Sequence, residues 1–285
     1  MYLFRPDPTS LRAGPSSAVM VIKGGFNLAF DCTAPTPMIL AVHIRPEETV
    51  HLVEPEIFTL FPAIDYSDYT DSFGNRCTKL VAPPGRLSIW SRFTMGHDGS
   101  PEQLPLYAYQ HAVQELPEET LLYLVGSRYC DTQKLADLAW AQFGGCWQGW
   151  PLIQAILNYT HQRIRFGYQF ARNDRTAFEA HQEQTGVCRD FAHLAITLCR
   201  CMNIPARYCT GYLGDIGVPR DPAPMDFSAW FEVYMGGRWW ALDARHNQPR
   251  IGRITIARGR DAADVAISTA FGAAILAEFN VITEA

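Results

Sequence analysis

The fold is decided by TGVCRDFAHLAITLCRCMNIPARYCTGYL (residues 185–213) and by SAWFEVYMGGRWWALDARHN (residues 228–247). From residue 188 the first stretch carries apolar side chains on nearly all sides of a helical wheel, which predicts a buried core helix. A strand over 206–213 and a β-hairpin with Gly236-Gly237 at its turn come next. The sequence therefore predicts a helix packed on an antiparallel sheet.

Cys188 lies in the first turn of the predicted helix, because Gly186 lets the chain turn sharply just before it. In the first turn of a helix, unpaired backbone N–H groups and the helix dipole favour an anion such as a thiolate. We therefore expect an apparent pKa well below about 8.5 for this thiol. The alternative is that Cys188 only packs, since free cysteine is among the most buried residue types.

The hairpin is expected to bring polar side chains to the helix. Counting back from a two-residue turn makes Ser228 and Asp243 diagonal neighbours on one face, roughly 7–8 Å apart at the backbone. This places a thiol on the helix, a polar group on one strand and an acid on the next strand. A nucleophile, a base and an orienting carboxylate require this arrangement. The predicted cross-strand pairs are Met235 with Arg238, Trp230 with Asp243 and Ser228 with Arg245.

The chain resembles the bacterial transglutaminase-like superfamily, strongly over residues 130–260. That family pairs a Gly-x-Cys helix and a Pro-Ala-Arg strand with a His-Ala-Trp-x-Glu-Val hairpin that ends in Asp. The matching residues here are Gly186-Val187-Cys188, Pro205-Ala206-Arg207, Ser228-Ala229-Trp230-Phe231-Glu232-Val233 and Leu242-Asp243-Ala244.

The resemblance implies a papain-like transglutaminase core in which Cys188 attacks an acyl carbon and Asp243 orients the base. The family uses histidine as that base, and Ser228 stands at its position. A hydroxyl does not accept a proton near neutrality as imidazole does. Three functions are compatible with this site. The first is a thiol enzyme that acts on an amide, ester or thioester with an atypical Cys-Ser-Asp triad. The second is a non-hydrolytic lyase, isomerase or acyl transferase, and the third is a pseudoenzyme that binds a peptide or small ligand.

Three other histidines are candidates for the missing base. His246 is close in sequence, but strand alternation from Asp243 turns it to the opposite face unless the strand ends first. His193 lies about 140° around the helix from Cys188, which favours a role in the core. His181 precedes the helix and is expected in a surface loop.

Substrate contacts are predicted on the hairpin and next to it, and no metal or cofactor is expected. No Cys-x-x-Cys pair, phosphate-binding glycine loop or dinucleotide fingerprint occurs in the sequence. The Gly- and Pro-rich loop 215–226 is a candidate lid. The candidate substrate-binding residues are Trp230, Arg207, Arg245, His246 and Asn247.

The residues before the helical region have the pattern of short strands. Runs rich in β-branched and aromatic residues alternate with turn residues from about residue 20 to 124, and DSFGN (residues 71–75) is expected to form a hairpin turn. This part resembles the companion domain that precedes the core in many bacterial members of the family. We therefore predict an α+β protein with an N-terminal antiparallel β-sandwich-like domain (1–130) and a catalytic core (131–285).

Composition indicates an ordinary globular protein. The chain has 285 residues, a formal net charge of −5, 48% hydrophobic and 19% charged residues, and no basic run that would indicate nucleic acid. Its first residues do not resemble a secretory signal, no apolar run would span a bilayer, and the eight scattered cysteines favour reduced thiols. We expect a cytoplasmic protein that acts on a peptide or small-molecule acyl substrate, and the apolar run 266–282 suggests a possible homo-oligomer contact.

Overall fold

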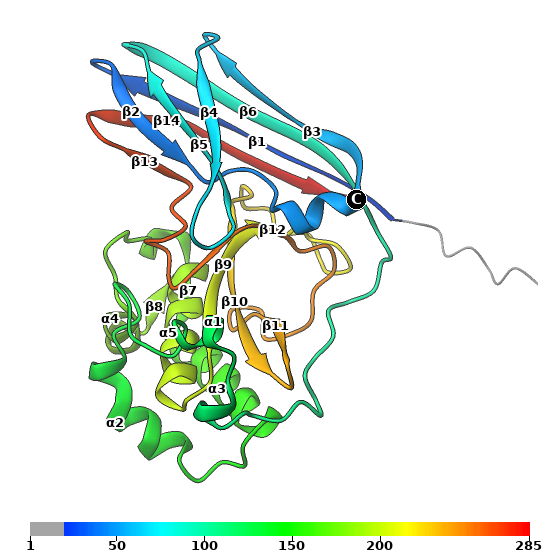
Figure 1. Ribbon diagram of the computed structural model, residues 1–285, viewed down its shortest axis with the longest axis vertical. Helices are drawn as coiled ribbons and strands as arrows, with labels where there is room; N and C mark the ends of the chain where they lie inside the picture. The colour runs from blue at the N-terminus through cyan, green and yellow to red at the C-terminus, as the bar shows by residue number, and fades with distance from the viewer. Residues whose placement is uncertain (1–19) are drawn as a thin grey trace, which may run out of the picture.

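The computed structural model describes residues 20–285, which form a β-sandwich and an α+β core (Figure 1). One sheet of the sandwich has the strand order β14-β1-β6-β3 and the other β13-β2-β5-β4. The sandwich strands are β1 (Met20–Cys32), β2 (Thr36–Leu40), β3 (Leu52–Phe61), β4 (Tyr66–Thr70), β5 (Arg76–Ala82), β6 (Gly85–His97), β13 (Ser268–Ala270) and β14 (Ala274–Glu284).

The core has a four-stranded antiparallel sheet in the order β11-β10-β9-β12, with helices packed against it. Its main elements are α2 (Thr132–Phe143), α3 (Trp150–Arg163), α4 (Ala177–Glu183), α5 (Cys188–Cys201), β9 (Ala206–Tyr212), β10 (Ser228–Met235), β11 (Arg238–Leu242) and β12 (Ile254–Gly259). The shorter elements are α1 (Glu118–Leu121), β7 (Arg165–Phe166), β8 (Thr185–Gly186) and three 3-10 turns, η1 (Pro46–His51), η2 (Val113–Glu115) and η3 (Tyr168–Phe170).

The sandwich forms because its strands alternate buried and exposed side chains. Along β6, for example, Leu87 and Ile89 are fully buried while their neighbours are more exposed. The predicted turn at 71–75 is confirmed. It joins β4 to β5, Asp71 Oδ1 accepts backbone N–H groups of Phe73 and Asn75 at 2.8 Å, and Gly74 takes a positive φ of 77°.

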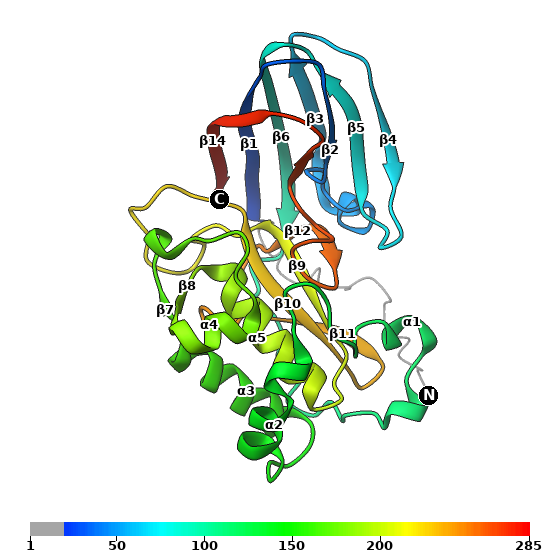
Figure 2. The same ribbon diagram turned by 90° about the vertical axis from the view of Figure 1, so that its left-hand side faces the viewer.

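The predicted division of the chain into a sandwich (1–130) and a core (131–285) differs from the structure in two places, before residue 131 and at the C-terminal end. The last two strands leave the core: β14 pairs with β1 and β13 pairs with β2 in the sandwich (Figure 2). Residues 98–131 instead lie along the core, where Gln110 Nε2 donates to the carbonyl of Met202 at 3.0 Å. The thirteen residues of β1 need a hydrogen-bonding partner on each side, and β14 supplies one of them.

Helix α5 is the centre of the core, as its sequence predicts. It packs against β9 and β10 on one side and against α2, α3 and α4 on the other (Figure 2). From Asp190 to Cys201 every residue of the helix is buried. The helix is therefore fixed by packing on all sides, and Cys188 is its first residue.

The sandwich and the core meet at β12. Arg258 on this strand pairs with Glu47 of η1 and with the buried Glu232 of β10. The side chain of Asn75 accepts the backbone N–H of Arg258 and donates to its carbonyl, both at 2.8 Å. The interface is therefore bonded through both side chains and backbone.

Within residues 20–285, no helix has the length and apolar character required to cross a membrane.

Candidate active site

A buried carboxylate holds the start of α5. Asp190 Oδ2 accepts the backbone N–H of Val187 at 2.8 Å and pairs with Arg175 Nη1 at 2.9 Å. A Cβ on Gly186 would lie 2.6 Å from this oxygen, so the close approach requires glycine. The prediction that Cys188 lies in the first turn of the helix is confirmed, since Cys188 is its first residue. Gly186 itself lies in the short strand β8, so what requires glycine there is the lack of room beside Asp190 and not a turn.

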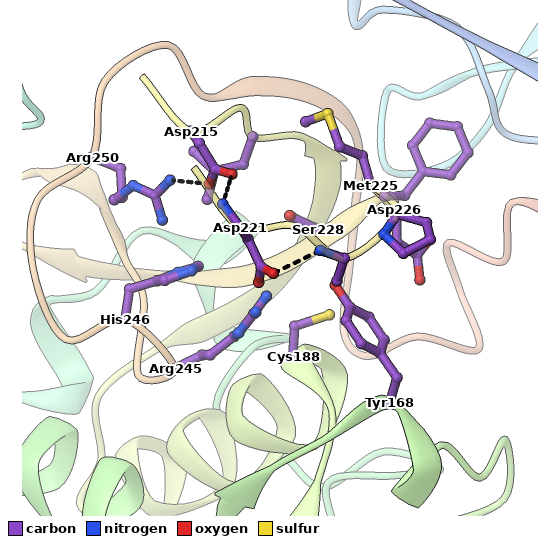
Figure 3. A pocket seen from close by; sticks show the side chains of 14 residues that line it. Tyr168, Cys188, Asp215, Asp221, Met225, Asp226, Ser228, Arg245, His246 and Arg250 are labelled. Carbon is purple, nitrogen blue, oxygen red and sulfur yellow. Dashed lines mark hydrogen bonds and ion pairs between the residues drawn. The ribbon is translucent and has the colours of Figure 1, made fainter. Parts of the chain in front are cut away.

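Cys188 lines two pockets. The first, the His246 pocket, also includes Ser228, Arg245 and His246, which are labelled with Cys188 in Figure 3. The second, the Tyr129 groove, runs from Cys188 past Tyr129 toward β13. Of the eight cysteines, all of which lie in the described part of the chain, Cys146 and Cys188 are partly exposed and the other six are buried. Cys188 is therefore a thiol that a ligand in either pocket would reach.

The expected low pKa of Cys188 is wrong. Burial raises the pKa of the thiol to about 11, and the negative charge of Asp226 adds to this effect. The positive charge of Arg245 and the backbone N–H of Ala229 favour the thiolate, but they do not offset the loss of solvation. The position of Cys188 at the start of a helix is therefore not enough to lower the pKa of its thiol. Without a ligand, the thiol is protonated at neutral pH.

Alkylation of Cys188 by iodoacetamide is expected to accelerate with pH up to about pH 11, because the reaction requires the thiolate. Each pH unit below that value should reduce the rate about tenfold. Peptide mass spectrometry would follow Cys188, with the partly exposed Cys146 of the same molecule as the internal comparison. A rate that reaches its plateau below pH 8.5 would contradict burial as the dominant influence.

The hairpin register is confirmed, but the ladder of paired residues is shorter than predicted. Gly236 and Gly237 have φ values of 57° and 83°, as a tight hairpin turn requires, and Met235 pairs with Arg238. The ladder between β10 and β11 stops at the pair Phe231 and Leu242. The predicted pairs of Trp230 with Asp243 and of Ser228 with Arg245 therefore do not form. Ser228 pairs instead with Gly211 on β9.

Because β11 ends at Leu242, the chain turns and brings His246 back to Asp243. The backbone N–H of Asn247 bonds to the carbonyl of Asp243 at 2.8 Å, which closes this turn. Nδ1 of His246 lies 2.8 Å from Oδ2 of Asp243. The alternation that would have turned His246 away does not apply, since it holds only within a strand. Asp243 therefore bonds to His246, and within residues 20–285 no hydrogen bond joins it to Ser228.

The Asp243 carboxylate is buried and strongly bonded. Oδ1 accepts the backbone N–H groups of Arg245 and His246 at 2.9 and 3.1 Å, and Oδ2 lies 3.4 Å from Nη2 of Arg253. Burial by itself would raise the pKa of Asp243. The hydrogen bond from His246 and the charge of Arg253 outweigh burial and hold that pKa well below its usual range. Asp243 is therefore ionised whenever the protein is folded near neutral pH.

The remaining predicted substrate contacts divide into two groups. Arg245 lines the His246 pocket and stacks on Phe166, with its guanidinium carbon 3.6 Å from the ring centroid. The other three lie outside the residues that line the two Cys188 pockets. Trp230 is 1% exposed and lies beneath Arg253, Arg207 pairs with Glu232 at 2.6 Å, and Asn247 donates to Asn158 at 2.9 Å.

The two other candidate histidines bond elsewhere. His193 is fully buried, accepts the backbone N–H of Ala262 at 3.1 Å and stacks on Tyr129. His181 lies 2.8 Å from the hydroxyl of Tyr159. Of the three histidines that the sequence offers as a base, His246 is thus the one brought to the pocket of Cys188.

The sequence did not indicate several residues that line the His246 pocket. Tyr168 comes from η3, Asp215, Asp221 and Asp226 come from the loop before β10, and Arg250 follows the turn of His246 (Figure 3). The glycine and proline content of 215–226 indicated a loop but not which side chains turn inward. Among the described residues, no three His, Cys, Asp or Glu side chains are grouped to hold a metal ion.

Residues 146–244 match the transglutaminase-like superfamily in its core domain. The crystal structure of a proposed cysteine protease from Cytophaga hutchinsonii is 30% identical in sequence, with a TM-score of 0.81. The match covers 94% of this chain and 91% of that one. It therefore includes both the sandwich and the core.

Curated relatives match over a shorter length. An uncharacterized protein of Mycobacterium leprae is 35% identical over 98 residues, which are 32% of this chain and 33% of that protein. An uncharacterized protein of Mycobacterium tuberculosis is 32% identical over 128 residues, 40% of each chain. The chain thus spans a third to two fifths of the length of these relatives.

Proposed function

Because this chain belongs to the transglutaminase-like superfamily, we propose that it is a thiol enzyme that transfers or hydrolyses an acyl group through Cys188. The substrate is an amide, ester or thioester of a peptide or small molecule. The observation that carries the proposal is the place of Cys188. It is a partly exposed thiol at the first residue of the central helix, in the wall of two pockets.

Ser228 lines the same pocket as Cys188. By the sequence resemblance, it stands where the family carries histidine. Its hydroxyl binds a water molecule or a polar group of the substrate, but it does not accept the thiol proton at neutral pH. General acid–base catalysis is typically worth about 10²–10⁴-fold in rate. A site that used only Cys188, Ser228 and Asp243 would therefore be a slow hydrolase.

A second candidate function is ligand binding without turnover. The raised pKa of the Cys188 thiol favours it, because a protonated thiol is a poor nucleophile. In this case, the two pockets would hold a peptide or small molecule and no acyl-enzyme would form. The two functions differ in whether Cys188 becomes covalently modified.

The proposed enzyme is expected to take up one acyl group on Cys188 when incubated with p-nitrophenyl acetate. Intact-mass measurement would count the groups, and peptide mapping would locate them. Cys188→Ala should remove the adduct, and Cys146→Ala is the matched control because Cys146 is the other partly exposed cysteine. Acylation that is spread over both thiols, or absent from Cys188, would refute the enzyme and leave the binding function.

A further inference from the structure

Acyl transfer through Cys188 requires a proton acceptor in the site. Its thiol is protonated at neutral pH, and Ser228 beside it is not a base. If the proposed function holds, attack on an acyl carbon must release the proton from Sγ to another group. That group must line the same pocket and must have a free lone pair.

The carboxylates of the pocket meet this requirement poorly. Asp215 accepts the backbone N–H of Asp221 at 2.8 Å and lies 3.4 Å from Arg250. Asp221 in turn accepts the backbone N–H of Ala223 at 2.9 Å. Asp226 lies near the thiol, where its charge opposes formation of the thiolate, and burial raises the pKa of its own carboxyl above the ordinary value. A carboxylate ordinarily has a pKa near 4, so it is a far weaker base than imidazole.

His246 meets the requirement. Its Nδ1 lies 2.8 Å from the ionised Asp243, so Nδ1 must carry the ring proton and donate it to Oδ2. Nε2 is then left with its lone pair, and it has no hydrogen-bond partner within residues 20–285. The imidazole lines the pocket of Cys188, and its side chain is 22% exposed. Figure 3 shows the ring directed from its turn into this pocket.

Resting on the function proposed above, we infer that His246, oriented by Asp243, is the general base of this site. The pair has the same internal geometry as the His-Asp part of a catalytic triad, although its histidine comes from the turn after β11 and not from β10. A general base acts on its proton directly or through one water molecule. Ser228, which lines the same pocket, would position that water.

In this mechanism, His246 accepts and returns each proton that the reaction moves. As Sγ forms a bond to the acyl carbon, Nε2 takes the thiol proton, and the imidazolium gives it to the departing amine, alcohol or thiol. Water then attacks the thioester and gives a proton to Nε2 as its oxygen bonds to the acyl carbon. The C–S bond breaks, and the same proton restores the Cys188 thiol. Asp243 keeps its hydrogen bond to Nδ1 throughout.

The test compares His246→Ala with the wild-type protein in the rate of acylation of Cys188 by p-nitrophenyl acetate. We expect a loss of about 10²-fold or more, since the base is removed. Added imidazole should restore a large part of the rate in His246→Ala, because a free base can enter the space left by the side chain. Ser228→His in the same variant should also restore activity.

The matched control is His161→Ala. Nδ1 of His161 lies 3.2 Å from the carbonyl of Ala244 in the same turn, but His161 does not line the pocket. A structural role for His246 would make both variants respond alike and would leave imidazole without effect. Either result, or wild-type acylation rates in His246→Ala, would overturn the inference. If Asp226→Asn loses the rate instead, Asp226 is the base.

The same experiment separates this inference from the proposed function. If wild-type Cys188 is acylated and His246→Ala is acylated equally fast, the function stands and the assignment of the base is wrong. If wild-type Cys188 is never acylated while the protein remains folded, the enzyme proposal fails and the base assignment fails with it.

Discussion

Replacing Asp243 with asparagine is expected to lower the rate of acyl transfer by about 10²–10⁴-fold, because the amide no longer fixes the ring proton of His246 on Nδ1. The variant should also lose about 3 kcal/mol in the free energy of unfolding, since the buried Arg253 loses one of its two carboxylates. Steady-state hydrolysis and urea denaturation measure the two effects. Asp137→Asn, at an exposed position on α2, is the control.

The stability effect of Asp243 has a defined pH dependence. Its pKa in the folded protein is held far below the usual value near 4. The stability that it contributes is therefore fully present above about pH 4 and is lost as the pH falls toward the folded pKa. The difference between wild type and Asp243→Asn should be largest at pH 7 and smaller at pH 3. A difference that stays constant between these pH values would contradict the assignment.

Replacing Glu232 with glutamine is expected to lower the free energy of unfolding by about 3–5 kcal/mol, the cost of leaving buried charges without their partner. Glu232 is 5% exposed and bonds to Arg207 at 2.6 Å and to Arg258 at 3.0 Å. Burial opposes its ionisation, but the two guanidinium groups keep its pKa below the ordinary value. Urea denaturation at pH 7 measures the loss.

Asp31→Asn is the matched control for Glu232. Asp31 also bonds to an arginine, Arg86, at 2.8 Å, but both side chains of this pair are exposed on the sandwich. Water screens exposed pairs, so the urea midpoint should hardly move. A Glu232 variant that behaves like the Asp31 variant would show that its buried pairs do not stabilise the joint between sandwich and core.

The sequence by itself determined the features that depend on local geometry. Apolar side chains on all sides required a buried α5, and two consecutive glycines set the pairing of Met235 with Arg238. The motif around Cys188 identified the superfamily. These features follow from helix periodicity, strand alternation and turn chemistry, each of which acts over only a few residues.

The tertiary structure decided what depends on distant segments. β11 ends at Leu242 because the chain there turns, and only that turn makes His246 rather than Ser228 the partner of Asp243. β14 returns to the sandwich because β1, some 250 residues earlier, offers it an open edge. The pKa of Cys188 follows from burial and from the charges of Asp226 and Arg245, which lie outside its helix. Burial and strand partners are set by the packing of the whole chain, which no local pattern contains.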